Sequence, residues 1–272
     1  DPSVNPLYRG HCPHLERLLR DHATPMDAQL GVPGLPQSAT GQATLLTGVN
    51  AAKHVGRHGE GFPGEELKEL IRRHNLFDEL IRRGYRTTFA NAYYSDRVSR
   101  DALKRRQSVT TVAVLHAFSR VRGPDEMMRN RAVYQDLTRR TLVPRGYEGP
   151  VIRPREAAHH LLSIAADYDF TLFEYFQTDL AGHQRNDAET PRMLRELDEF
   201  LERVSLFGAT PGQLLVLASD HGNLEDAGTT QHTSHPVPLV ALGTGAEALQ
   251  ATARSLETFA GALLAFYPPR SG

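Results

Sequence analysis

The sequence has few of the features that mark secreted, membrane-spanning or nucleic-acid-binding proteins. Its 272 residues contain one cysteine, Cys12, which excludes an intrachain disulfide and a cysteine-rich metal site. This scarcity favours a reducing, cytoplasmic setting. The apolar runs are short, as at 214–218, whereas a membrane helix needs about 20 apolar residues. No basic stretch followed by an apolar one indicates a secretory signal, and the formal net charge of −1 suggests no polyanionic partner.

The charges are nevertheless unevenly placed along the chain. Residues 94–155 hold 14 Lys or Arg and 6 Asp or Glu, a net charge of +8, whereas the remainder carries −9. Glycines and prolines also interrupt the basic stretch. We therefore interpret residues 94–150 as a basic insert or cap, and residues 1–93 plus 151–272 as an α/β core that binds metal.

Apolar, β-branched runs alternate with amphipathic stretches in the core. Near-continuous apolar runs are typical of parallel strands buried on both faces. We expect strands at 86–90, 170–178, 213–219 and 237–242, helices at 64–83, 155–166, 188–207 and 256–266, and two further helices in the insert at 112–119 and 127–140. Strands that alternate with helices indicate a layered α/β fold. The expected architecture is a mostly parallel sheet sandwiched by helices, with a small inserted cap.

Polar side chains adjoin three of the expected strands, either directly after the strand or just before it: Asp179 and His183, Asp220 and His221, and His232. In an open parallel sheet, ligands bind at the carboxyl ends of the strands, so these side chains should converge on one crevice. Asp and His together suit Zn²⁺ or Mn²⁺ better than Ca²⁺, which takes oxygen ligands only. The pattern predicts a transition-metal site at this crevice.

A fourth polar turn precedes an expected helix and contains Ser38. A hydroxyl at a helix N-terminus lies in positive potential beside free N–H groups, which stabilises an alkoxide and can hold a phosphate. Taken alone, such a serine is most often an N-cap, and an Asp-His-Gly sequence could be present only because these residues favour a turn. The joint occurrence of four such turns favours a catalytic site.

These residues together resemble the alkaline phosphatase superfamily, and most of all its branch of cofactor-independent phosphoglycerate mutases and phosphopentomutases. Asp179 and His183 match the D-x-x-x-H pair of that family, and His232 matches the histidine of its H-T-x-x-P-V-P motif. The resemblance implies that these three residues hold one divalent metal ion.

The same resemblance implies a second divalent metal ion, so that the cofactors would be two ions of Mn²⁺ or Zn²⁺. Asp220 and His221 match the D-H of the family's D-H-G-N motif, and Ser38 falls on the nucleophile position, where it would also bind this second metal. A sulfatase is excluded, because the segment that begins at Ser38 lacks the Pro and Arg of the sulfatase motif C/S-x-P-x-R.

The sequence departs from the family pattern in two places. Family members carry a further metal-binding Asp at the end of a first strand, and no such strand is seen around Asp1, which Pro2 follows. We expect that ligand in a segment that precedes this sequence. The full-length mutases also carry a far larger insert than residues 94–150.

By resemblance, the chain is expected to be a two-metal phosphoryl-transfer enzyme that acts through a phosphoserine and interconverts 2- and 3-phosphoglycerate. A metal-dependent phosphomonoesterase and a non-catalytic, metal-retaining binding protein are the alternatives. The expected partner is a small phosphorylated metabolite. No membrane partner is expected. No nucleic acid is expected either, because aromatic residues do not interleave with the basic ones. Arginines of the insert could clamp the anionic end of the substrate: Arg105, Arg106, Arg129, Arg131, Arg139 and Arg140.

Overall fold

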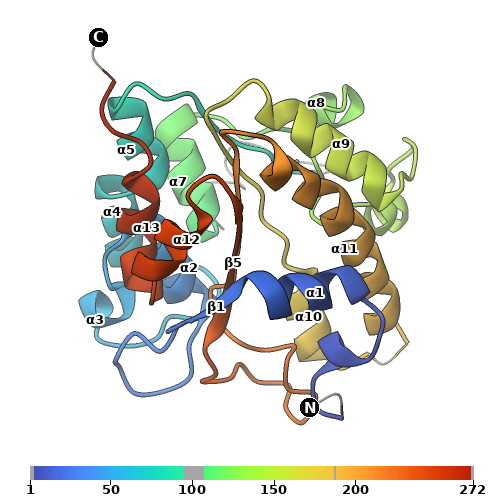
Figure 1. Cartoon of the computed structure of the whole chain (residues 1–272), viewed down its shortest axis with the longest axis horizontal. Coiled ribbons are helices and arrows are strands. Elements are labelled where there is room, and N and C mark those ends of the chain that lie inside the picture. Colours follow the sequence, from blue (N-terminus) through green and yellow to red (C-terminus); the bar gives the residue numbers. More distant parts are fainter. Residues whose placement is uncertain (1–2, 95–106, 187, 271–272) are drawn as a thin grey trace.

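The strands lie between two layers of helices in the computed structural model, which describes residues 3–94, 107–186 and 188–270 (Figure 1). The strands are β1 (Ala23–Met26), β2 (Thr87–Phe89), β3 (Phe170–Leu172), β4 (Leu214–Ala218) and β5 (Val237–Gly243). The α-helices are α1 (Pro13–His22), α2 (Ser38–Thr47), α3 (Ala51–Val55), α4 (Glu65–Arg73), α5 (Leu76–Arg82), α7 (Val109–Phe118), α8 (Pro124–Met128), α9 (Pro154–Ala165), α10 (Gln177–Gln184), α11 (Thr190–Val204), α12 (Ala246–Thr252) and α13 (Leu256–Leu264). Short 3-10 helices are η1 (Pro6–Tyr8), η2 (Arg140–Arg145) and η3 (Ser205–Ala209).

The strands form two small sheets. The first has the order β1-β5-β4 with both pairs antiparallel, and the second is the parallel pair β2-β3. The expected α/β class is confirmed, but the mostly parallel sheet is not, because β2-β3 is the only parallel strand pair in the described residues. The chain passes from β4 to β5 through a loop without a crossover helix, and neighbouring parallel strands usually need such a helix.

Strand β5 shows how the two helical layers share the core. Val237, Leu239 and Ala241 belong to one hydrophobic cluster, and Val240 belongs to the other. Successive side chains of a strand point to opposite faces, so both faces of β5 are covered. In Figure 1, α2, α4, α7 and α13 lie on one side of β5, and α1, α9 and α11 lie on the other. This sandwich explains the continuous apolar runs without a parallel sheet.

Several expected elements have different bounds in the structure. The helix expected at 64–83 is divided into α4 and α5 at Asn75, whose side chain accepts a hydrogen bond from the Asp78 backbone N–H and caps α5. The strand expected at 170–178 ends at Leu172, and α10 begins five residues later. Strand β1 was not expected; it tolerates Pro25 because it lies at the edge of its sheet.

The proposed insert at 94–150 contributes to two hydrophobic clusters. Helix α7 packs into the main core through Val109, Val112 and Val114. A separate small cluster, which we call the insert cluster, contains Ala92, Met127, Ala132, Tyr134, Leu142 and Tyr147. The helix expected at 127–140 is wrong, since α8 ends at Met128, the 3-10 helix η2 begins only at Arg140, and Arg139 has a left-handed backbone with a φ of 65°. The division into core and insert stays a prediction.

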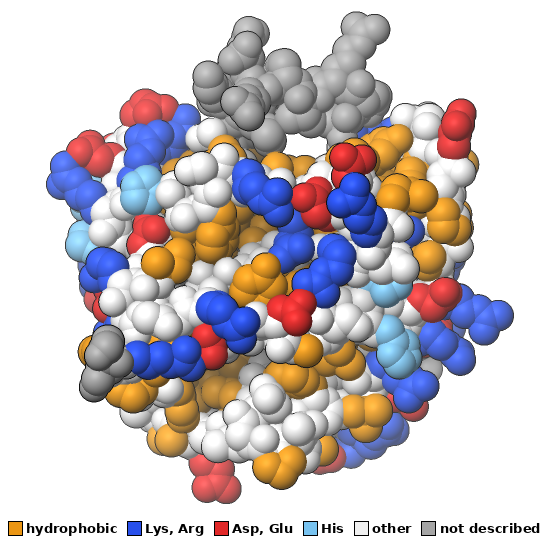
Figure 2. Space-filling model, turned by 90° about the horizontal axis from the view of Figure 1, so that it is seen from above, with side chains coloured by type: hydrophobic (Ala, Val, Ile, Leu, Met, Phe, Trp, Pro, Cys, Tyr) orange, Lys and Arg blue, Asp and Glu red, His pale blue; other side chains and the backbone are white. Residues whose placement is uncertain are grey.

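Basic side chains do not gather into one patch on the face that is uppermost in Figure 1. Figure 2 shows Lys and Arg interspersed with Asp and Glu over the described part of this face. No helix within the described ranges is long and apolar enough to cross a membrane.

Asp169, directly before β3, ties the parallel strand pair to the C-terminal segment. Its carboxylate accepts hydrogen bonds from the Arg86 backbone N–H at 2.8 Å and from Arg270 Nη2 at 2.8 Å. Burial alone would raise the pKa of this carboxyl, but the bonds from Arg270 and Arg86 outweigh it and lower the pKa.

Asp169→Asn is therefore expected to lower the urea midpoint of unfolding at pH 7. A lowered folded-state pKa stabilises the protein above the ordinary carboxyl pKa of about 4, and this stabilisation is lost as the pH falls through the folded pKa. The difference between the wild type and the variant should shrink at about pH 3. A difference in midpoint that is the same at both pH values would contradict this assignment.

Candidate metal centre

Helix α10 presents the first pair of candidate ligands. Asp179 and His183 are one helical turn apart and therefore share a face. His232, in the loop before β5, meets them, and the possible ligand atoms of these three residues all lie within 4.8 Å of one another. Asp179 Oδ1 is 3.4 Å from His183 Nε2 and 3.4 Å from His232 Nε2. The structure thus brings together the three residues expected to hold the first metal.

Backbone carbonyls orient both histidine rings toward this point. His183 Nδ1 donates to the Thr230 carbonyl at 2.8 Å, and His232 Nδ1 donates to the Pro36 carbonyl at 2.7 Å. In neutral rings this leaves a lone pair on each Nε2, and the two Nε2 atoms are 3.0 Å apart. Two lone pairs at that distance repel unless a proton or a metal ion lies between them. A carbonyl on the other ring nitrogen is the usual support of a metal-binding histidine.

The second group of expected ligands adjoins the first. Ser38 Oγ is 2.9 Å from His221 Nε2, which in turn lies 3.5 Å from Asp220 Oδ2. The His221 and His232 rings stack with centroids 3.7 Å apart, and His221 Nε2 is 3.9 Å from Asp179 Oδ1. The residues expected at two metals therefore form one continuous centre at the carboxyl ends of β3 and β4.

Ser38 is the first residue of α2 and does not act as its N-cap. The N-cap is Gln37, whose side chain makes no capping hydrogen bond, and the Ser38 hydroxyl contacts His221 instead. A simple capping role for this serine is therefore wrong. The hydroxyl lies at the positive end of the helix dipole, next to an imidazole nitrogen that can accept its proton.

The electrostatics of the centre are those of a site arranged for a cation. Burial raises the pKa of the Asp179 carboxyl, but His232, His221 and His183 more than offset this and lower it. Burial alone would lower the pKa of His232, but the hydrogen bonds with Asp179 and the Pro36 carbonyl outweigh burial, so the pKa of His232 is raised. Asp179 Oδ1 is buried and accepts no hydrogen bond. An unpartnered, buried carboxylate oxygen facing imidazole nitrogens fits a divalent transition metal.

Three polar residues near the centre were not expected from the sequence. Glu225 joins the two ends of the loop between β4 and β5, because its carboxylate accepts from the Asn223 backbone N–H at 2.7 Å, from Thr233 Oγ1 and from His235 Nδ1 at 3.1 Å. The side-chain amide of Asn223 is buried against Gly182 of α10 and has no partner. The third is Glu174, just after β3, which was missed because the expected strand extended past it.

The arginines expected to clamp the substrate have varied surroundings. Arg105 and Arg106 lie outside the described residues. Arg129 is exposed, and Arg131 pairs with Asp167. Arg139 is 2% exposed and donates to Met127 O and Tyr147 Oη inside the insert cluster.

Arg140 lines a cavity of about 430 Å³ between the insert and the face of α10 that carries Gln177 and Gln184. It forms an ion pair with Glu196 at 2.7 Å. The clamping role stays a prediction for all six arginines.

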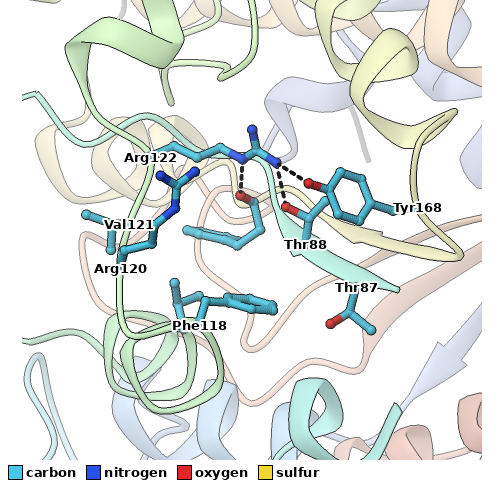
Figure 3. A pocket seen from close by; sticks show the side chains of 9 residues that line it. Thr87, Thr88, Phe118, Arg120, Val121, Arg122 and Tyr168 are labelled. Carbon is cyan, nitrogen blue, oxygen red and sulfur yellow. Dashed lines mark hydrogen bonds between the residues drawn. The ribbon is translucent and has the colours of Figure 1, made fainter. Parts of the chain in front are cut away.

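A smaller cavity, of about 200 Å³, lies at the free edge of β2 (Figure 3). Arg122 fixes its wall by donating to the Phe89 carbonyl, to Thr88 Oγ1 and to Tyr168 Oη. Its guanidinium is thereby committed to internal contacts, so this arginine has a structural role.

Comparison with known proteins shows a family similarity in the C-terminal part of the chain. A sequence model described as the Metalloenzyme superfamily matches residues 152–265, a stretch that contains both Asp-His pairs and His232. In this stretch, which is less than half of its length, the chain is similar to the Metalloenzyme superfamily. The chain is also 32% identical over 107 residues to a 2,3-bisphosphoglycerate-independent phosphoglycerate mutase of Legionella pneumophila, covering 35% of this chain and 21% of that protein. The mutase of Desulforudis audaxviator is 31% identical over 100 residues, covering 35% and 20%.

These matches confirm the resemblance to the branch of phosphoglycerate mutases. The matched part spans about a fifth of the length of the curated relatives. The match to the Metalloenzyme superfamily also implies divalent metal ions.

Solved structures agree on the fold. The PH0037 protein of Pyrococcus horikoshii aligns over 100% of this chain and 92% of its own, with a TM-score of 0.59 and 11% identity. An alkaline phosphatase from the Antarctic bacterium TAB5 aligns with a TM-score of 0.48 and 10% identity, which is too low to carry weight.

Proposed function

We propose that this protein is a two-metal phosphoryl-transfer enzyme that acts on a small phosphorylated metabolite through a phosphoserine at Ser38. The observation that carries the proposal is the contact of 2.9 Å between Ser38 Oγ and His221 Nε2 at the start of α2, beside the Asp179, His183 and His232 group. A serine hydroxyl at a helix N-terminus, in contact with one expected metal ligand and beside a further metal-binding group, is arranged for attack on phosphorus.

The proposed chemistry follows from the residues of the chain. Asp179, His183 and His232 would hold one Mn²⁺ or Zn²⁺, and Asp220, His221 and Ser38 would hold the other. When bound, such ions polarise a phosphoryl oxygen and lower the pKa of a coordinated hydroxyl. Ser38 Oγ attacks phosphorus in line with the leaving oxygen, and the N-terminus of α2 stabilises negative charge on the equatorial oxygens. The phosphoserine is then resolved by water or by a hydroxyl of the retained metabolite.

The identity of the second acceptor distinguishes the two enzymatic alternatives. Transfer back to the retained metabolite gives a mutase that interconverts 2- and 3-phosphoglycerate, as similarity to the mutases suggests. Transfer to water gives a phosphomonoesterase. The arginines favour the phosphomonoesterase, because Arg139 is buried and both Arg131 and Arg140 pair with acidic residues. Cations already paired within the protein hold a released anion less well.

The experiment supplies the purified protein with Mn²⁺ or Zn²⁺ and follows 3-phosphoglycerate and a panel of other phosphomonoesters by ³¹P NMR. We expect metal-dependent turnover that chelation abolishes. Formation of 2-phosphoglycerate would establish the mutase, and release of inorganic phosphate would establish the phosphatase. A protein that binds both metals but turns over no phosphoester would contradict the proposal and favour the metal-retaining binding protein.

A further inference from the structure

Glu225 lies in the loop between β4 and β5, and its carboxylate accepts hydrogen bonds from both ends of that loop. At the first end, the Asn223 backbone N–H donates to Oε2 at 2.7 Å. At the second end, Thr233 Oγ1 and His235 Nδ1 donate to Oε1, the latter at 3.1 Å. An ionised carboxylate only accepts hydrogen bonds, and both oxygens of Glu225 have donors from the chain. The side chain therefore joins the two ends of the loop.

The ends that this carboxylate joins lie next to two expected metal ligands. Asn223 is two residues after His221, and Thr233 directly follows His232. The His221 and His232 rings stack with their centroids 3.7 Å apart and their planes at 18°. In the proposed centre, these two histidines bind different metal ions. The spacing between the two ends of the loop therefore sets the spacing between one ligand of each ion.

A backbone bridge and the lack of a side chain at Gly222 bring the two ends close together. The Thr233 N–H donates to the Gly222 carbonyl at 3.0 Å, in an isolated antiparallel bridge. A Cβ added to Gly222 would lie 2.5 Å from Glu225 Oε1, so the carboxylate packs directly against this bridge. A single backbone hydrogen bond fixes only one point between two segments, whereas the further bonds to Glu225 hold both segments at one spacing.

The residues that donate to Glu225 from either side of the bridge have little access to water. Asn223 and Thr233 are 5% and 6% exposed, and the Glu225 side chain is 25% exposed. Hydrogen bonds to an ionised carboxylate are stronger than those between neutral groups. Removing the carboxylate would leave a backbone N–H and a hydroxyl of these buried residues without this acceptor, which is costly. The two ends of the loop would then move to regain partners, and the two histidines would move with them.

We infer that Glu225 is a positioning residue, which sets the separation of the two proposed metal ions by holding the backbone beside His221 and His232. The inference rests on the proposed function, because it takes each of these histidines as a ligand of a different ion. A carbonyl group orients a single ring, as the Pro36 carbonyl does for His232 at 2.7 Å. Glu225 instead relates the positions of the two ligands to each other. A misplacement of about 1 Å can reduce a reaction rate by about 10²-fold, so this spacing should matter for phosphoryl transfer.

The test measures Mn²⁺ binding and the magnetic interaction between the bound ions. The wild type, Glu225→Gln and Glu225→Ala are titrated with Mn²⁺ by calorimetry, and electron paramagnetic resonance spectra are recorded at saturating Mn²⁺. We expect two ions per chain and a spin-coupled spectrum in the wild type. In Glu225→Ala the affinity for Mn²⁺ should fall by about 10- to 100-fold, and the coupled signal should weaken. Glu225→Gln keeps one acceptor oxygen, so it should lie between the two.

The matched control is Asp198→Ala, which removes a carboxylate that joins two helices away from the centre. Asp198 of α11 accepts hydrogen bonds from the His14 N–H at 3.2 Å and the Leu15 N–H at 2.7 Å, at the start of α1. This variant should also lower the urea midpoint of unfolding, but its Mn²⁺ affinity and its spectrum should match those of the wild type.

The outcomes separate the inference from the proposed function. Wild-type affinity and coupling in both Glu225 variants, or in Glu225→Gln if Glu225→Ala does not fold, would overturn the inference and leave the proposed function intact. An equal loss of coupling in Asp198→Ala would also overturn it, because the loss would then reflect reduced stability alone. A wild type that binds fewer than two ions would remove both.

Discussion

Ser38→Ala is expected to reduce phosphoryl transfer by about 10³-fold or more and to leave the first metal in place. Loss of a covalent nucleophile removes the whole route through the intermediate, and such losses are large. The Ser38 hydroxyl contacts His221, whereas the first metal group of Asp179, His183 and His232 does not include it. The measurement is the initial rate on the best phosphoester, together with metal content and retention of ³²P on the denatured protein.

The control for this variant is a second serine at the start of a helix. Ser255 caps α13, with its side chain accepting from the Thr258 backbone N–H, and it is not among the residues of the centre. Ser255→Ala should destabilise the fold by about 1 kcal/mol and leave the turnover number unchanged. If Ser38→Ala kept its turnover and still acquired radiolabel, another residue would have to be the nucleophile.

Gly41→Ala is expected to destabilise the protein by about 1–3 kcal/mol and to reduce activity strongly. The added Cβ would be 2.5 Å from the Asp220 carbonyl oxygen, a backbone atom that cannot rotate away. Helix α2 and the turn that carries Asp220 would therefore have to separate, which moves Ser38 relative to His221. The higher helix propensity of Ala favours the variant by only about 0.5–1 kcal/mol, less than the expected penalty.

Gly261→Ala is the matched control, because Gly261 lies on the exposed side of α13 and an added Cβ meets nothing within 4 Å. That variant should be more stable by about 0.5–1 kcal/mol. The measurements are urea unfolding curves and turnover of both variants. A Gly41→Ala protein with the unfolding midpoint and activity of the wild type would show that α2 and the Asp220 turn are not in tight contact.

The grouping of the candidate metal ligands could be predicted because its signal is local. Asp179 and His183 are one helical turn apart, and Asp220 and His221 are adjacent, so short stretches of sequence already place each pair together. The ends of neighbouring strands then bring the pairs to one place. Glu225 gave no such signal, because its role comes from the hydrogen bonds that it accepts within the folded loop between β4 and β5.

The roles of the arginines, in contrast, could not be predicted from the sequence. Charge density along the chain predicted a basic segment, but an arginine can bind a ligand, pair with a neighbour or be buried, and the sequence pattern is the same in each case. Arg139 is enclosed by Tyr147 and Met127, whereas Arg140 pairs with Glu196 of α11. These partners come from other parts of the chain, so only the folded structure identifies them.

The sequence by itself predicted the candidate metal ligands and the position of several strands and helices, because apolar periodicity and motif spacing are properties of neighbouring residues. The tertiary structure alone decided that β4 and β5 are antiparallel, since strand direction depends on how the connecting loop returns to the sheet. It alone also decided that the Ser38 hydroxyl faces His221. This juxtaposition arises from the packing of α2 against the turn after β4, and packing joins residues that are distant in the sequence.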